Sequence, residues 1–79
     1  MSTAYVLITC ELGSEEEIIN QLKNIEGVKE THGIFDTYDI LVKVELENVE
    51  KVREIIIWKI RQLSKICSTF TLMGTVDQN

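Results

Sequence analysis

The order of hydrophobic patterns along the chain constrains its fold more than any single motif. Four segments alternate between apolar and polar residues or are rich in β-branched residues, as strands are, and two segments carry apolar residues at helical spacing. The elements therefore follow the order strand, helix, strand, strand, helix, strand. The expected strands cover residues 4–12, 28–35, 38–46 and 67–76, and the expected helices start at Glu15 and at about Val49, the second ending near Lys65.

This order predicts a ferredoxin-like α+β fold over residues 1–79 as a single domain. Two right-handed crossovers in one sheet give a four-stranded antiparallel sheet, in which the strands follow the order 4-1-3-2 and both helices cover one face. The other face stays open, and neither side of the strands is polar enough for water. A chain of 79 residues has a thin core, so we expect two sheets to pack as a dimeric α/β barrel. The open face carries either Tyr5, Leu7, Leu41, Phe70 and Leu72 or the opposite set.

Local signals mark the ends of the helices. Ser14 and Glu17 have the spacing of a capping box, and Asn48 can cap the second helix. Gly27 is a natural C-terminal cap for the first helix. Trp58 falls opposite the apolar stripe of the second helix, which favours its being covered by another subunit. The tail at residues 77–79 is expected to be frayed.

Composition excludes several classes of function. The net charge of −5, with acidic residues spread over the chain, disfavours direct binding to nucleic acid, which needs clustered Lys and Arg. No apolar run approaches the roughly 18 residues of a membrane span. Residues 1–4 lack the basic segment of a signal peptide, so the cytoplasm is the expected compartment.

Motifs for catalysis or metal binding are scarce. Cys10 and Cys67 have neither CxxC spacing nor a histidine partner, so we expect no metal site and no cofactor. Antiparallel pairing of the first and last strands would bring the two cysteines close together, as two buried free thiols or as a disulfide. His32 is the only histidine and the only obvious acid–base candidate. The sequence thus favours a binding protein over an enzyme.

Residues 31–45, THGIFDTYDILVKVE, followed by a long helix and then ICSTFTLM, resemble a known family. The match covers nearly the whole chain and is to the effector-binding RAM domain of the Lrp/AsnC transcription regulators. Tyr38-Asp39-Ile40 fits that family's Tyr-Asp-aliphatic turn, and residues 68–71, STFT, fit the segment that opens its last strand. Asp36 stands where the family has a turn glycine. The chain also starts at the first strand of the effector domain, so it resembles members without a helix-turn-helix domain.

The resemblance implies a mechanism. In that family, dimers form through their sheets and assemble into octamers or decamers, and small effectors, often amino acids, bind between dimers. A chain without its own DNA-binding domain would act by assembly or by co-assembly with full-length relatives. Carried onto this chain, the implied effector contacts are Gly33, Ile34, Asp36, Thr37, Tyr38, Asp39, Thr69 and Thr71.

The chemistry of these residues suits an amino-acid zwitterion. Asp36 or Asp39 can accept its ammonium group, and turn N–H groups or threonine hydroxyls can donate to its carboxylate. Both aspartates could instead only brace the turn, and Thr69 and Thr71 could be ordinary strand residues. Two alternatives stay open: a small dimeric α+β-barrel enzyme that uses His32, and a purely structural ring.

Overall fold

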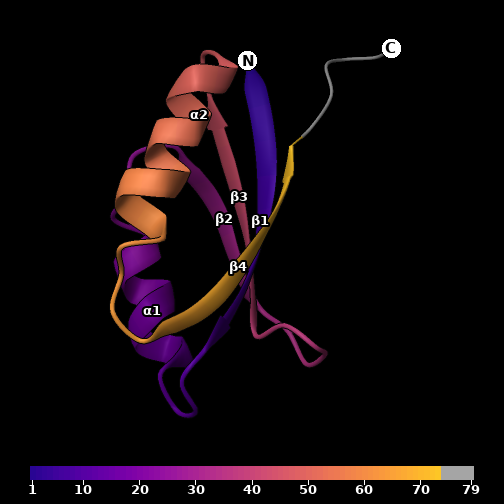
Figure 1. Ribbon diagram of the computed structural model, residues 1–79, viewed down its shortest axis with the longest axis vertical. Helices are drawn as coiled ribbons and strands as arrows, with labels where there is room; N and C mark the ends of the chain where they lie inside the picture. The colour runs from indigo at the N-terminus through magenta and orange to yellow at the C-terminus, as the bar shows by residue number, and fades with distance from the viewer. Residues whose placement is uncertain (74–79) are drawn as a thin grey trace.

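The computed structural model describes residues 1–73 and contains the predicted succession of elements (Figure 1). The helical segments lie together on one side of the sheet. The part of the predicted last strand beyond residue 73 and the predicted frayed tail lie outside the described residues. The elements are β1 Ser2–Cys10, α1 Glu15–Leu22, β2 Val28–Gly33, β3 Ile40–Leu46, α2 Val49–Ile55, the π-helix η1 Ile56–Ile60, and β4 Ile66–Met73.

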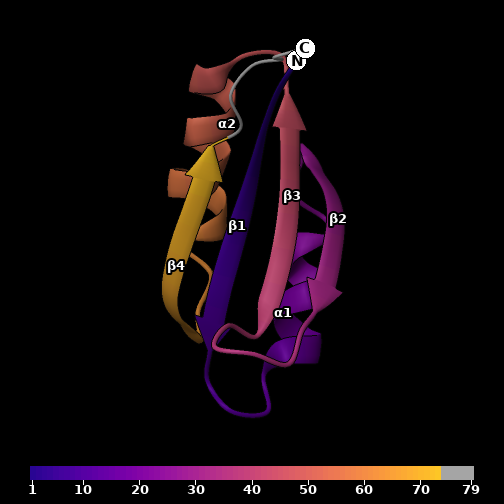
Figure 2. The same cartoon turned by 90° about the vertical axis from the view of Figure 1, so that its right-hand side faces the viewer.

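The sheet has the strand order β2-β3-β1-β4, and all neighbouring strands are antiparallel. This is the predicted order read from the other edge, so the ferredoxin-like βαββαβ fold is confirmed. β1 is central and pairs with β3 on one side and with β4 on the other. Figure 2 shows the four strands from the side that no helix covers. Within residues 1–73, no helix has the length and hydrophobicity that crossing a membrane requires.

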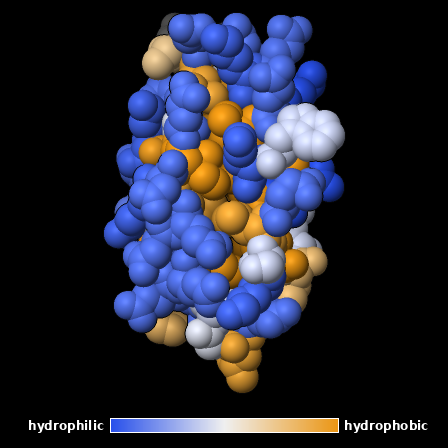
Figure 3. Space-filling view, turned by 90° about the vertical axis from the view of Figure 1, so that its left-hand side faces the viewer, coloured by the Kyte–Doolittle hydropathy of each residue, from blue (hydrophilic) through white to orange (hydrophobic). Residues whose placement is uncertain are grey.

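The core lies between the sheet and the helices and is entirely aliphatic. Alternate residues of β1 and β3 point into it, and the helices cover it. Figure 3, seen from the helix side, shows a strip of hydrophobic surface framed by polar side chains. Full burial of each Val, Leu or Ile stabilises the fold by about 1.5–3 kcal/mol. The completely buried residues are Ala4, Val6, Ile8, Ile18, Leu22, Ile40, Val42, Val44, Val52 and Ile60.

The start of α1 differs from the prediction. Ser14 makes no capping hydrogen bond to the helix; its Oγ donates instead to the Glu11 carbonyl at 2.6 Å. The capping box was therefore wrong, because the tight turn after β1 buries Ser14 and directs its hydroxyl backward. The predicted C-terminal cap was also wrong, because α1 ends at Leu22 and its cap is Lys23. Gly27 lies in the turn before β2 in a left-handed conformation, with φ +90°, and a Cβ there would lie 2.8 Å from Leu46.

The second helix begins as predicted, changes type midway and ends at Ile60, short of the predicted end near Lys65. Asn48 Oδ1 accepts from the Lys51 N–H at 2.9 Å, which confirms the predicted cap. From Ile56 the helix is π-type, and the Arg61 N–H donates to the Ile56 carbonyl at 2.9 Å. Buried residues spaced four apart drift by about 40° per step around an α-helix, and a wider turn offsets that drift. Val52, Ile56 and Ile60 thus stay over the core.

Candidate functional site

The candidate site is built on the loop between β2 and β3, residues 34–39. The Ile34 N–H donates to the Asp39 carbonyl at 2.9 Å, which closes the loop. β2 ends at Gly33 and β3 starts at Ile40, so both strands are shorter than predicted. Within the loop, the Thr37 N–H donates to Asp36 Oδ1 at 2.8 Å.

Asp39 fixes the loop to the end of the central strand. Its N–H donates to the Ile8 carbonyl at 2.8 Å, and its Oδ2 accepts from the Cys10 N–H at 2.9 Å. Asp39 is therefore partly a structural brace, but it braces β1 rather than its own turn. Asp36, by contrast, is exposed and contacts only the loop through its described hydrogen bond.

A depression of about 570 Å³ opens beside this loop. Four of its lining residues are among the effector contacts that the family resemblance implied, and two are not. One is Glu15, at the start of α1, and the other is Phe35, whose ring is fully exposed. The lining residues are Glu15, Gly33, Ile34, Phe35, Asp36 and Asp39.

The other implied contacts lie elsewhere. Tyr38 stacks on Phe70 with ring centroids 6.5 Å apart, while Thr37 is exposed and outside the lining. Thr69 and Thr71 pair with Ile8 and Val6 on β1, and neither lines the depression of its own chain.

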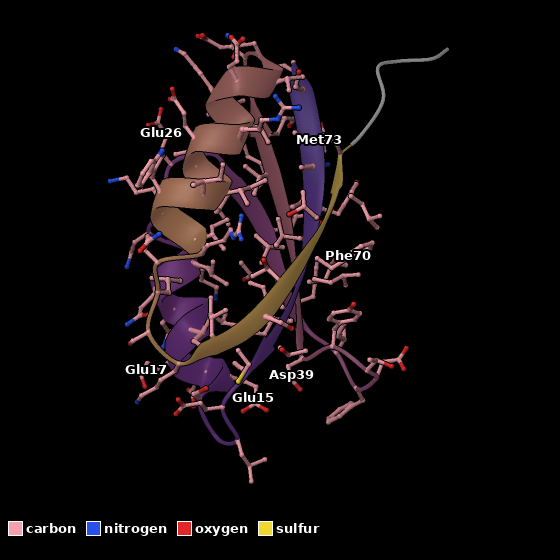
Figure 4. All side chains as sticks on the ribbon, in the orientation of Figure 1. Glu15, Glu17, Glu26, Asp39, Phe70 and Met73 are labelled. Carbon is pink, nitrogen blue, oxygen red and sulfur yellow. The ribbon has the colours of Figure 1, made fainter. Side chains whose placement is uncertain are left out.

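Glu15 could have been found from the predicted topology. It starts the helix that follows β1, and the β2–β3 loop must return to that same end of the sheet, where Figure 4 shows Glu15 and Asp39. Phe35 gave no such signal, because a phenylalanine in a predicted strand is expected to be packed.

The cysteines at this end of the sheet are both free. Cys10 pairs with Ile66, next to Cys67, so the predicted neighbourhood is correct, but Cys67 is exposed and the prediction of two buried thiols was wrong. Cys67 lies where the pairing of β1 and β4 shifts register, on a strand at the edge of the sheet. Burial raises the pKa of the Cys10 thiol, a hydrogen bond with Ser14 opposes this, and the charges of Asp39 and Glu15 raise it further.

The uncovered face of the sheet carries an apolar cluster on β1, β3 and β4, with polar residues such as Lys43 and Glu30 beside it. The register places Tyr5 opposite Leu72 and Leu7 opposite both Phe70 and Leu41. Phe70 and Leu72 are 49% and 48% exposed. Of the two predicted sets, the structure selects Tyr5, Leu7, Leu41, Phe70 and Leu72, called the open face below.

Of two residues singled out in the sequence, Trp58 lies apart from both surfaces, whereas His32 pairs with Leu41 and therefore lies on the uncovered side of the sheet, at its β2 edge. Trp58 is on η1, opposite the core, and is 65% exposed. His32 is exposed on the edge strand β2, with its Nε2 3.2 Å from Glu30 Oε1. The layer between sheet and helices, which a barrel enzyme would use, holds aliphatic side chains rather than His32.

Comparison with known proteins defines the class of domain to which this fold and loop belong. The family profile of the Lrp/AsnC ligand binding domain matches residues 3–77. The chain therefore belongs to the Lrp/AsnC family and is a ligand-binding domain of its regulators.

Particular relatives agree. An uncharacterized HTH-type transcriptional regulator of Pyrococcus furiosus is 36% identical over 78 residues, which are 95% of this chain and 52% of the relative. The chain thus spans about half the length of the curated relatives that it matches. The crystal structure of FFRP-DM1 is 32% identical with a TM-score of 0.90, covering 95% of this chain and 100% of that one. AsnC of E. coli, 23% identical with a TM-score of 0.87, shares the fold over 99% of this chain and 52% of its own.

Proposed function

We propose that this domain is a non-enzymatic, cytoplasmic sensor that binds an amino acid beside the β2–β3 loop. Binding then acts on transcription through the domain's own assembly or through co-assembly with full-length relatives. The observation that carries the proposal is the depression of about 570 Å³ with Asp36 and Asp39 in its lining, in a chain of the Lrp/AsnC family.

The two carboxylates retain capacity for a ligand. An ionised carboxylate offers about four lone-pair sites. Asp36 receives the N–H of Thr37 and Asp39 receives the N–H of Cys10, so each keeps acceptor sites for an ammonium group. Thr69 and Thr71 do not line the depression of their own chain, so any contribution from their hydroxyls would come from a neighbouring subunit.

The open face supports sheet-to-sheet dimerisation. Its large apolar side chains leave several kcal/mol of burial unrealised in a single chain, at about 25 cal/mol per Å². Dimers would then assemble to an octamer or decamer. Size-exclusion chromatography with light scattering measures this directly. A monomer at all concentrations would contradict the assembly part of the proposal.

Calorimetry of the intact assembly against the twenty amino acids tests the sensor. Asp36→Asn is the sharpest variant, because it keeps an oxygen acceptor for the Thr37 N–H while removing the charge. We expect it to weaken binding about tenfold, and Asp36→Gly to weaken it at least as much. Glu16→Gln, exposed and outside the depression, is the matched control. If no amino acid binds at millimolar concentration while the assembly is intact, the proposal fails.

Co-assembly needs its own experiment. A tagged full-length Lrp/AsnC protein from the same source would be mixed with this chain, purified by the tag and weighed by light scattering. Mixed assemblies of defined mass support co-assembly. Separate homo-oligomers would leave only action through the domain's own ring.

A further inference from the structure

The depression beside the β2–β3 loop is strongly asymmetric in charge. Glu15, Asp36 and Asp39 line it, and no lysine or arginine among residues 1–73 does. A neutral amino acid brings one positive and one negative group. Its ammonium group could donate hydrogen bonds to these carboxylates, but its own carboxylate would be repelled by all three. A ligand with a second cationic group would match this lining better.

The apolar part of the lining fits the same kind of ligand. Ile34 and the fully exposed ring of Phe35 lie in the wall of the depression next to Asp36. An aromatic face attracts an ammonium or guanidinium group, and an aliphatic side chain packs against the methylene stem that carries it. The lining therefore offers apolar contacts for the stem of the ligand as well as carboxylates for its cationic groups.

A metal ion fits the lining less well than an organic cation. Among residues 1–73, no group of three or more His, Cys, Asp or Glu side chains is placed to hold a metal ion. The carboxylates come instead from the start of α1, from the interior of the loop at Asp36 and from its end at Asp39. Cationic groups separated by an alkyl stem can reach such separate acceptors.

The charges of Asp39 and Glu15 both act on the nearby Cys10 thiol. Its pKa is raised first by burial and then by the charges of Asp39 and Glu15, against the opposing hydrogen bond from Ser14. Carboxylates from α1 and from the loop therefore act together at one point.

We propose, building on the function above, that the effector is a small organic dication: an amino acid with a cationic side chain or an alkyl diamine. Glu15 is the residue that sets this preference, because it adds a charge from outside the loop. Phe35 and Ile34 hold the stem between the two cationic groups.

Calorimetry of the full chain in its assembled state tests the proposal with lysine, arginine, cadaverine, leucine and methionine as probes. We expect lysine or arginine to bind at least tenfold more tightly than leucine or methionine. Glu15→Gln should reduce that ratio to about threefold or less. Glu16→Gln, one residue along and outside the lining, should leave it unchanged. Light scattering and circular dichroism confirm that both variants keep the fold and assembly.

The outcomes separate this inference from the function on which it rests. Cadaverine binding as tightly as lysine identifies a diamine, and lysine binding without cadaverine identifies an amino acid; both support the dication. Neutral amino acids binding as tightly as basic ones overturn the inference and leave the sensor standing. Equal ratios in Glu15→Gln and Glu16→Gln also overturn it. Binding of no probe and no other amino acid overturns sensor and inference together.

Discussion

The two faces of β1 contrast although both are apolar. Ala4, Val6 and Ile8 face the helices and are fully buried, while Tyr5 and Leu7 face the other way and stay partly exposed. The helix-covered face carries small and β-branched side chains that fill a thin layer. The open face carries larger side chains that can reach a second sheet. We therefore expect one face to serve folding of the single chain and the other to serve the association proposed above.

Truncating one residue on each face should separate these roles. Ile8→Ala leaves a cavity in the core and should lower the free energy of unfolding by about 2–5 kcal/mol. Leu7→Ala, the neighbour on the open face, should cost the single chain much less but weaken association. Urea unfolding at low protein concentration, followed by light scattering, measures both. Equal losses of stability would contradict the division between the faces.

A charge on the open face should break the assembly without unfolding the chain. Phe70→Asp would place an uncompensated carboxylate on the face where we propose that a second sheet packs, and we expect it to weaken dimerisation about a hundredfold. Leu12→Asp, fully exposed in the turn after β1, is the control and should not change the dimer. A dimer that survives Phe70→Asp would show that another surface forms it.

The loop that joins β2 to β3 contains one aspartate tied to the sheet and one that is not. Asp39→Ala removes the acceptor for the Cys10 N–H and should destabilise the chain by about 1–2 kcal/mol. Asp36→Ala removes only the bond to Thr37 N–H in an exposed loop and should cost about 0.5 kcal/mol. Thermal unfolding compares them. A larger loss of stability for Asp36→Ala than for Asp39→Ala would show that Asp36, and not Asp39, is the residue that braces the fold.

The smallest expected effect concerns the Cys10 thiol. Its pKa is raised in the folded chain, so its thiolate forms at higher pH there than in the unfolded chain. The stability that this proton contributes is therefore lost as the pH rises through the pKa of the folded chain. In a Cys67→Ser background, Glu15→Gln should lower the pKa of Cys10, and Glu16→Gln should not. Alkylation rates against pH measure this shift. Identical profiles would show that the Glu15 charge is not felt at Cys10.

The sequence predicted the element order, the strand order and the Asn48 cap because these follow from local patterns and from the handedness of crossovers. It did not decide which face of β1 is covered, because Tyr5 and Leu7 alternate with Val6 and Ile8 and both sets are apolar. The π-helix was missed because its cause, the four-residue spacing of buried residues over the core, is a tertiary effect.

The candidate site was predicted in part. The turn motif indicated Asp36 and Asp39, which line the depression, but it gave no information on the direction in which each loop side chain points. Tyr38 stacks on Phe70 at the open face, and the exposed Phe35 is among the lining residues. Whether these residues bind an effector stays a prediction.

The irregular pairing of β2 with β3, between Val28 and Glu30, bears on how growth of the sheet is limited. A bulge twists the outer rim of an edge strand, and charged side chains there, such as Lys29 and Glu30, make a further strand costly to add. Contacts about a two-fold axis close into finite particles, whereas head-to-tail pairing of strand edges can add chain after chain. The bulge thus favours closed assembly over fibre formation at the β2 edge.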